Sequence, residues 1–320
     1  MSTSIVERFL AGDRAALSRL ITWAENRDER FAAAMSVAHA RVGRGWRIGI
    51  TGPPGAGKST LVNELAKHLR TRGRTVGVLA VDPSSPLSGG ALLGDRIRME
   101  ERTLDPGVFI RSMASRGSHG GLARAAVDAC DLMDAFGIDE ILLETVGVGQ
   151  AEYEIVSATD TALVVLCPGA GDGIQAMKAG ILEVADVLVV NKSDLPGAER
   201  LALDLDEAVH IRQAGRAAWQ TPVVSASASK GDGIEDVVRA IESHREFLRA
   251  GRLQSTRRQK RLEQVRHLLV ERIGSELWGP AGFQSRAEAL LDSGAAPYDI
   301  VESLQRAIVD GASTRGERQS

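Results

Sequence analysis

The most informative segment of the sequence is Gly52-Pro53-Pro54-Gly55-Ala56-Gly57-Lys58-Ser59. It matches G-x-x-x-x-G-K-[ST], the phosphate-binding P-loop. An apolar run at 47–51 precedes it and predicts a strand, and apolar residues at helical spacing over 60–70 predict a helix after it. A strand, a glycine-rich turn and a helix N-terminus bring consecutive backbone N–H groups onto phosphate oxygens. The stretch therefore predicts a nucleotide phosphate site.

The side chains of this loop suggest a division of labour. Lys58 is placed to reach the β- and γ-phosphates, and the hydroxyl of Ser59 is placed to hold Mg²⁺. The residues expected to cradle the nucleotide are Gly52, Pro54, Gly55, Ala56, Gly57, Lys58, Ser59 and Thr60.

Composition sets broad limits on the class of protein. The chain has 320 residues, 43% hydrophobic and 25% charged, which are values typical of globular domains. The net charge of −3 argues against a nucleic-acid binder. Two cysteines, Cys130 and Cys167, are too few for a disulfide framework and are expected to be reduced. No secretory signal and no long apolar segment are apparent, so we expect a cytoplasmic protein without a membrane or nucleic-acid partner.

The order of elements predicts an α/β fold, a doubly wound and mostly parallel sheet with helical extensions at both ends. We expect a helical N-terminal extension at 1–44 with Asp13 as a helix cap, and a P-loop domain at 45–250. A helical C-terminal arm is expected at 251–312 and a frayed tail at 313–320. The basic run Arg257, Arg258, Lys260 and Arg261 is interpreted as a solvated helix face. Strands are predicted at 47–51, 75–81, 108–112, 140–144, 161–167, 187–191 and 223–225.

A second motif selects the base. Asn191-Lys192-Ser193-Asp194 follows the sixth predicted strand and matches N-K-x-D, the guanine-recognition sequence. The carboxylate of Asp194 can accept hydrogen bonds from two guanine donors that adenine lacks there. Asn191 is expected to tie this loop to the P-loop, and the Lys192 stem to cover the base.

A further loop should contact the base after the last predicted strand. Ser225-Ala226 and Ser227-Ala228 both fit the expected Ser-Ala element. The second pair is favoured because a polar turn at 230–233 follows it and opens a helix.

Candidates for the metal and for water activation follow other strands. Glu144-Thr145-Val146-Gly147 occupies the place of the usual D-x-x-G, so Glu144 is expected to hold Mg²⁺ and Gly147 to sense the γ-phosphate. Asp82 and Asp95 are further magnesium candidates. Gln150 is a candidate for orienting the attacking water, and Lys58 and Glu144 complete the expected catalytic set.

Together these segments resemble the MeaB/MMAA (ArgK-type) family of P-loop GTPases. The resemblance lies in residues 52–60, 81–86, 88–99, 109–113, 120–123, 144–150, 168–172 and 191–194. It implies a homodimeric, Mg²⁺-dependent GTPase that binds GTP and GDP and assists an adenosylcobalamin-dependent acyl-CoA mutase, usually methylmalonyl-CoA mutase. Such proteins gate cobalamin loading and protect or reactivate the mutase, and their C-terminal helices form a dimerisation arm.

Three other functions remain open on the sequence alone. A metallochaperone GTPase should show a Cys- or His-rich metal site, whereas the six histidines here are scattered. A P-loop kinase of a small metabolite is disfavoured by N-K-x-D. A binding scaffold without hydrolysis is disfavoured by the intact Lys58, Ser59 and Glu144. No arginine finger is evident, and Arg96, Arg98 and Arg111 are the candidates.

Overall fold

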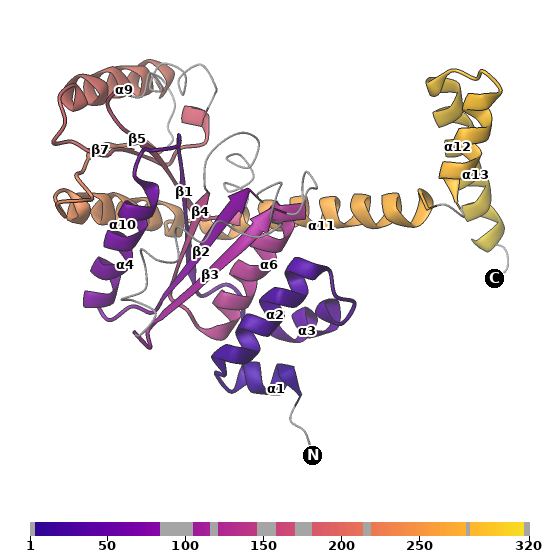
Figure 1. Ribbon diagram of the computed structural model, residues 1–320, viewed down its shortest axis with the longest axis horizontal. Coiled ribbons are helices and arrows are strands. Elements are labelled where there is room, and N and C mark those ends of the chain that lie inside the picture. The colour runs from indigo at the N-terminus through magenta and orange to yellow at the C-terminus, as the bar shows by residue number, and fades with distance from the viewer. Residues whose placement is uncertain are drawn as a thin grey trace. The chain divides into compact units, whose positions relative to one another are not determined.

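The computed structural model describes residues 4–83, 105–115, 121–145, 158–169, 181–213, 219–279 and 282–316. A seven-stranded sheet in the order β3-β2-β4-β1-β5-β6-β7 forms its centre (Figure 1). Every pair of neighbours in it is parallel. The strands are β1 (Trp46–Thr51), β2 (Val76–Pro83), β3 (Val108–Ser115), β4 (Glu140–Thr145), β5 (Thr161–Leu166), β6 (Val187–Val190) and β7 (Val223–Ser225). The predicted doubly wound α/β fold is confirmed.

Helices alternate with the strands and extend the chain at both ends. They are α1 (Ile5–Leu10), α2 (Arg14–Asn26), α3 (Arg30–Ala38), α4 (Lys58–Thr71), α6 (Gly121–Phe136), α9 (Ala198–Gln213), α10 (Ile234–Arg249), α11 (Leu253–Leu277), α12 (Phe283–Asp292) and α13 (Pro297–Gly316). Two short 3₁₀ turns, His39–Arg41 and Ile181–Glu183, complete the described elements.

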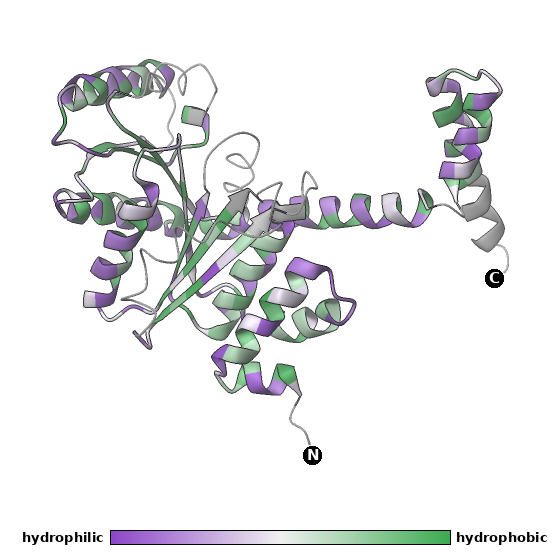
Figure 2. Cartoon of the chain, in the orientation of Figure 1, coloured by the Kyte–Doolittle hydropathy of each residue, from purple (hydrophilic) through white to green (hydrophobic). Residues whose placement is uncertain are grey.

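The strands are apolar on both sides because helices cover both faces of the sheet (Figure 2). On β4, Leu142 packs with α4 and α10, whereas Ile141 and Leu143 pack with α6 and the N-terminal helices. On β5, Leu163 joins the first of these clusters, and Val164 packs with α9 on the opposite face. Because successive strand side chains alternate between faces, one continuous apolar run feeds two cores.

The N-terminal helices are held by caps and by the sheet. The Asp13 side chain accepts hydrogen bonds from the backbone of Ala15 and Ala16, so the predicted cap is confirmed. On β3, Arg111 donates hydrogen bonds to Thr22 and Glu25 of α2. Arg111 therefore anchors the N-terminal helices to the sheet.

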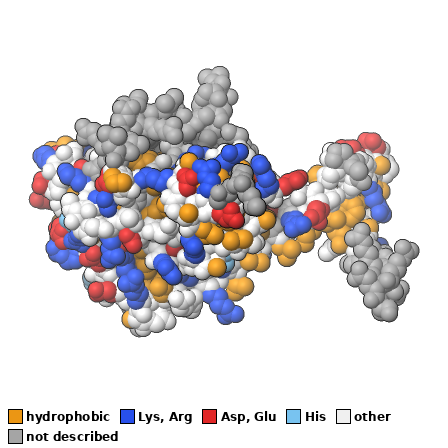
Figure 3. Space-filling model, turned by 90° about the horizontal axis from the view of Figure 1, so that it is seen from below, with side chains coloured by type: hydrophobic (Ala, Val, Ile, Leu, Met, Phe, Trp, Pro, Cys, Tyr) orange, Lys and Arg blue, Asp and Glu red, His pale blue; other side chains and the backbone are white. Residues whose placement is uncertain are grey.

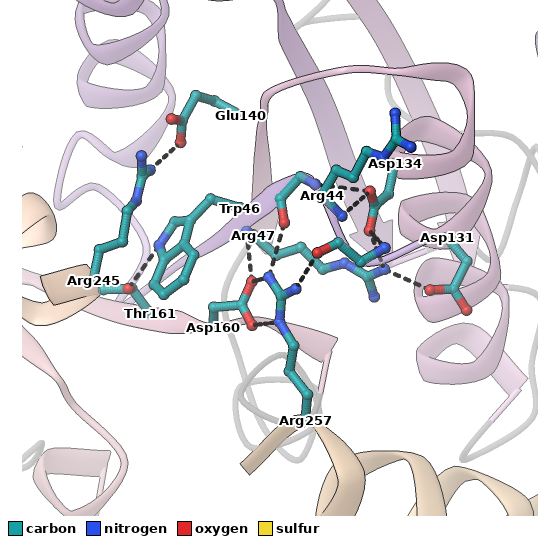
Figure 4. A network of polar contacts seen from close by, with 12 residues as sticks. Arg44, Trp46, Arg47, Asp131, Asp134, Glu140, Asp160, Thr161, Arg245 and Arg257 are labelled. Atoms are coloured by element: carbon teal, nitrogen blue, oxygen red, sulfur yellow. Dashed lines mark hydrogen bonds and ion pairs between the residues drawn. The ribbon is translucent and has the colours of Figure 1, made fainter. Parts of the chain in front are cut away.

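A buried ionic network closes the amino-terminal edge of the sheet (Figure 4). Arg47 of β1 lies 2.5 Å from Asp131 and 3.3 Å from Asp134, both on α6. Asp134 also accepts the backbone N–H groups of residues 43–45, just before β1. Burial opposes the charge of Arg47, but the facing carboxylates, with Asp131 the strongest, raise its pKa above the ordinary value.

Arg257 joins the same network at the start of α11. Its guanidinium makes a two-pronged contact with Asp160, at 2.8 and 2.7 Å, and donates to the carbonyls of Gly43 and Gly45 (Figure 4). Asp160 also accepts the backbone N–H of Arg47. The interpretation of residue 257 as part of a solvated face was wrong, because it pairs with a carboxylate that directly precedes β5.

The chain divides into two compact units, Met1–Arg257 and Arg258–Ser320. In the second unit, Ala287, Ile300 and Leu304 form a small core between α12 and α13. Large apolar side chains are exposed along α11, and hydrophobic atoms gather on the C-terminal helices (Figure 3). These exposed side chains on α11 are Leu262, Val265, Leu269, Val270 and Ile273.

Both cysteines are buried and free, as expected. Burial raises the pKa of the Cys130 thiol to about 12, so it stays protonated at neutral pH. Over the described ranges, no helix has the length and apolar character that a membrane crossing requires.

Candidate nucleotide site

The candidate site lies where the carboxyl ends of the parallel strands meet. The P-loop follows β1, Glu144 lies on the neighbouring strand β4 one residue before its end, and the N-K-x-D loop follows β6. In a doubly wound sheet, ligands bind at this edge. The fold thus brings together segments that are far apart in the sequence.

Two glycines of the P-loop occupy positions where a side chain would clash with neighbouring atoms. Gly52 has φ +139°, and a Cβ there would lie 2.1 Å from the carbonyl oxygen of Val165. Gly57 has φ +85°, and its Cβ would lie 2.4 Å from the Asn191 side-chain nitrogen. The helix α4 starts at Lys58, directly after this turn. The loop backbone is therefore packed against β5 and the N-K-x-D loop, and it leads into a helix N-terminus.

The Lys58 side chain is folded onto its own loop. Its ammonium group donates hydrogen bonds to the carbonyl oxygens of Gly52 at 2.8 Å and Pro53 at 3.0 Å. The Lys58 side chain is buried along the loop. The fold thus places a positive charge beside the P-loop backbone.

Ser59 and Glu144 meet at the first turn of α4. The hydroxyl of Ser59 donates to Glu144 Oε1 at 2.6 Å, and Glu144 is 1% exposed. A hydroxyl and a carboxylate are hard oxygen donors of the kind that Mg²⁺ takes, together with waters. These two residues fit a magnesium ion, which would neutralise phosphate charge when bound. Within the ranges that the structure describes, no group of three or more His, Cys, Asp and Glu could hold a metal ion.

Asn191 links the P-loop to the base loops. Its Nδ2 donates to the Ala56 carbonyl at 2.8 Å, and its Oδ1 accepts the Ala228 N–H at 3.0 Å. The backbone N–H of Ser193 donates to the Ala226 carbonyl. The N-K-x-D loop is therefore held to the P-loop on one side and to the Ser-Ala loop on the other. The link to the P-loop is the one predicted for Asn191.

The two Ser-Ala pairs are in different environments. Ser225 belongs to β7, paired with Val190. Ser227 donates from its hydroxyl to Asp194 Oδ1 at 2.7 Å. The favoured pair, Ser227-Ala228, is thus the one that faces Asn191 and Asp194.

Lys230, which is outside the predicted site set, contacts the same carboxylate. Its Nζ lies 3.1 Å from Asp194 Oδ2. The Ser227 hydrogen bond, followed by that of Lys230, lowers the pKa of Asp194 below its ordinary value. A lysine three residues past the Ser-Ala serine is the only sequence signal for this contact.

Several predicted residues fall outside what the structure describes. They are Asp95, Gly147, Gln150 and the side chain of Asp82, together with the finger candidates Arg96 and Arg98. Arg111 is described, and its guanidinium is committed to Thr22 and Glu25 of α2. In this structure Arg111 therefore links β3 to α2.

Comparison with known proteins decides the family. The profile described as "Methylmalonyl Co-A mutase-associated GTPase MeaB" matches residues 17–281. The chain belongs to the MeaB family of GTPases. A Pyrococcus abyssi protein of this kind, named as a GTPase, is 44% identical over 97% of this chain and 98% of its own. The methylmalonic aciduria type A homolog of Mus musculus is 35% identical over 82% of this chain and 68% of its own.

A solved structure has the same fold over nearly the whole chain. The crystal structure titled "LAO/AO transport system kinase" superposes with a TM-score of 0.72 at 29% identity. It covers 95% of this chain and 96% of that chain. The resemblance of the motifs to the MeaB/MMAA family is confirmed, and the chain is a GTPase of that family.

Proposed function

We propose that this MeaB-family GTPase is a chaperone of an adenosylcobalamin-dependent acyl-CoA mutase, most directly methylmalonyl-CoA mutase. It gates loading of the cobalamin cofactor and protects or reactivates the mutase. The observation that carries the proposal is the match of residues 17–281 to a family described as mutase-associated. The P-loop, Glu144 and the N-K-x-D loop, gathered at one sheet edge, support GTP as the nucleotide that drives it.

We assign the residues of the site as follows. The P-loop amides and Lys58 hold the phosphates, and Ser59 and Glu144 hold Mg²⁺, with Asp82 and Asp95 as further ligand candidates. Asn191, Lys192, Asp194, Ser227 and Ala228 hold the guanine base. Gly147 senses the γ-phosphate and Gln150 orients water. The 2.6 Å contact between Ser59 and Glu144 supports the metal assignment, and the contacts of Asn191 support the base assignment.

GTP hydrolysis with and without the mutase tests the function. We expect slow hydrolysis by the chain alone, because its one described finger candidate, Arg111, is committed to α2. Adding an adenosylcobalamin-dependent acyl-CoA mutase from the same source should accelerate it and give a complex on gel filtration. ATP should be a poor substrate in both assays. Unchanged hydrolysis without a complex would contradict the chaperone role while leaving the GTPase in place.

We also propose that the chain forms a homodimer through α11. Its exposed apolar side chains Leu262, Val265, Leu269 and Ile273 recur every three or four residues on one helix face, and a second copy offers the same face. Leu269 is 55% exposed at the middle of this face.

Leu269→Glu should convert the dimer into a monomer, because it places a charge at the centre of an apolar interface. Light scattering after gel filtration measures the mass. Ser275→Glu, elsewhere on the same helix, is the control and should leave the mass unchanged. A monomeric wild type, or a Leu269→Glu protein of unchanged dimer mass, would contradict the proposal.

A further inference from the structure

Both carboxylate oxygens of Asp194 are already engaged by the protein. Ser227 donates its hydroxyl to Oδ1 at 2.7 Å, and the Lys230 ammonium group lies 3.1 Å from Oδ2. The Asp194 side chain is 26% exposed, and that of Lys230 is 56% exposed. The contact therefore lies at the surface, where an incoming ligand can reach it.

The backbone under Lys230 is fixed. Its N–H donates to the Ser227 carbonyl at 3.0 Å, and Ser227 and Asp232 exchange a pair of backbone hydrogen bonds. Gly233 has φ +73°, and a Cβ there would lie 2.3 Å from the Ser225 carbonyl oxygen. The turn thus holds the base of the Lys230 side chain beside Asp194, while its exposed end is able to swing away.

The Lys230 ammonium group and the guanine base both donate hydrogen bonds to a carboxylate. Lysine has only donors, and guanine presents its N1–H and exocyclic amine, which are also donors. A carboxylate can accept about four hydrogen bonds, so Ser227 and Lys230 do not fill Asp194. Competition arises because the Lys230 ammonium group occupies the exposed side of Asp194, from which an incoming base has to approach. Ser227 is buried at 1% exposure, so Lys230 is the partner that is able to leave.

We propose that Lys230 competes with the guanine base for Asp194, so that GDP and GTP bind by displacing its ammonium group. This inference rests on the assignment of Asp194 to guanine made above. Lys230 is then a determinant of affinity and of nucleotide release, because its return to Asp194 assists departure of the base. Adenine offers Asp194 no donors in that position, so it gains nothing from displacing the lysine.

The test compares GDP binding by the full-length wild type and Lys230→Met, using calorimetric titration with GDP and with ADP. Methionine keeps a similar length and removes the charge. An exposed ion pair contributes little, so we expect Lys230→Met to bind GDP about 1.5- to 5-fold more tightly at low salt. The gain should shrink at about 1 M salt, where the ion pair is screened. ADP binding should not become tighter.

Lys67→Met is the matched control. Lys67 is also an exposed lysine in an ion pair, with Nζ 3.7 Å from Glu64 on α4, and its removal should leave GDP affinity unchanged. In an Asp194→Asn background, Lys230→Met should lose its effect, because the carboxylate charge for which Lys230 and guanine compete is gone.

Unchanged or weaker GDP binding by Lys230→Met would overturn the inference. Weaker binding would mean that the lysine stem covers the base. A wild type that binds GDP no better than ADP would instead overturn the guanine assignment itself. A wild type that prefers GDP, with an unaltered Lys230→Met variant, would leave that assignment intact and remove only the competition.

Discussion

Replacing Arg47 with methionine should lower the free energy of unfolding by about 3–5 kcal/mol, the usual cost of removing one partner of a buried ion pair. Its guanidinium faces Asp131 at 2.5 Å, and the two side chains are 9% and 2% exposed. Without that charge, the carboxylates on α6 remain in an apolar interior. A loss of this size is a large share of the stability of most proteins.

Urea unfolding followed by circular dichroism measures this loss. Arg200→Met is the control, because Arg200 pairs with Asp204 on the outside of α9 and is 81% exposed. It should cost less than about 1 kcal/mol. The double variant Arg47→Met with Asp131→Leu should recover part of the loss, since an apolar pair can replace a buried ionic one. A single variant within about 1 kcal/mol of the wild type would contradict the role given to Arg47.

Lys58→Ala should reduce the rate constant of GTP hydrolysis by about 10²- to 10³-fold, the usual cost of losing one charge-stabilising donor. The ammonium group lies within the P-loop turn, 2.8 Å from the Gly52 carbonyl oxygen, and the phosphate charge that develops during transfer needs a nearby cation. Single-turnover hydrolysis of GTP measures the effect free of product release.

Lys67→Ala, on the outer face of the same helix, should hydrolyse GTP at the wild-type rate. Far-UV circular dichroism of Lys58→Ala should match the wild type, because the helix α4 starts after glycines that set the turn without it. Hydrolysis by Lys58→Ala within a few-fold of the wild type would remove Lys58 from the catalytic set.

Turns and helix caps could be predicted from the sequence because each depends on residues only a few positions apart. Gly52 and Gly57 adopt backbone angles that favour glycine, so the P-loop turn could be read from residue type. Asp13 caps its helix through backbone groups two and three residues away. The continuous apolar runs in the sequence predicted a sheet covered by helices on both faces.

The observed end of a strand differs from the predicted one where pairing with a neighbouring strand lengthens it. The third strand reaches Ser115 rather than 112, because β2 pairs with it over its whole length. The first compact unit ends at Arg257, and that arginine is tied to Asp160, Gly43 and Gly45. None of these three partners is near Arg257 in the sequence.

Residue patterns alone were enough to predict the P-loop, the guanine-recognition loop, the alternation of strands and helices, and the family. The folded chain was needed to show which strands are neighbours, that Ser227 rather than Ser225 contacts Asp194, and that Arg257 is an anchor. It also placed Lys230 on Asp194. The physical reason is distance along the chain: a turn or a cap depends on residues a few positions away. An ion pair between Arg257 and Asp160 exists only because the order of strands in the sheet brings two remote segments to one edge.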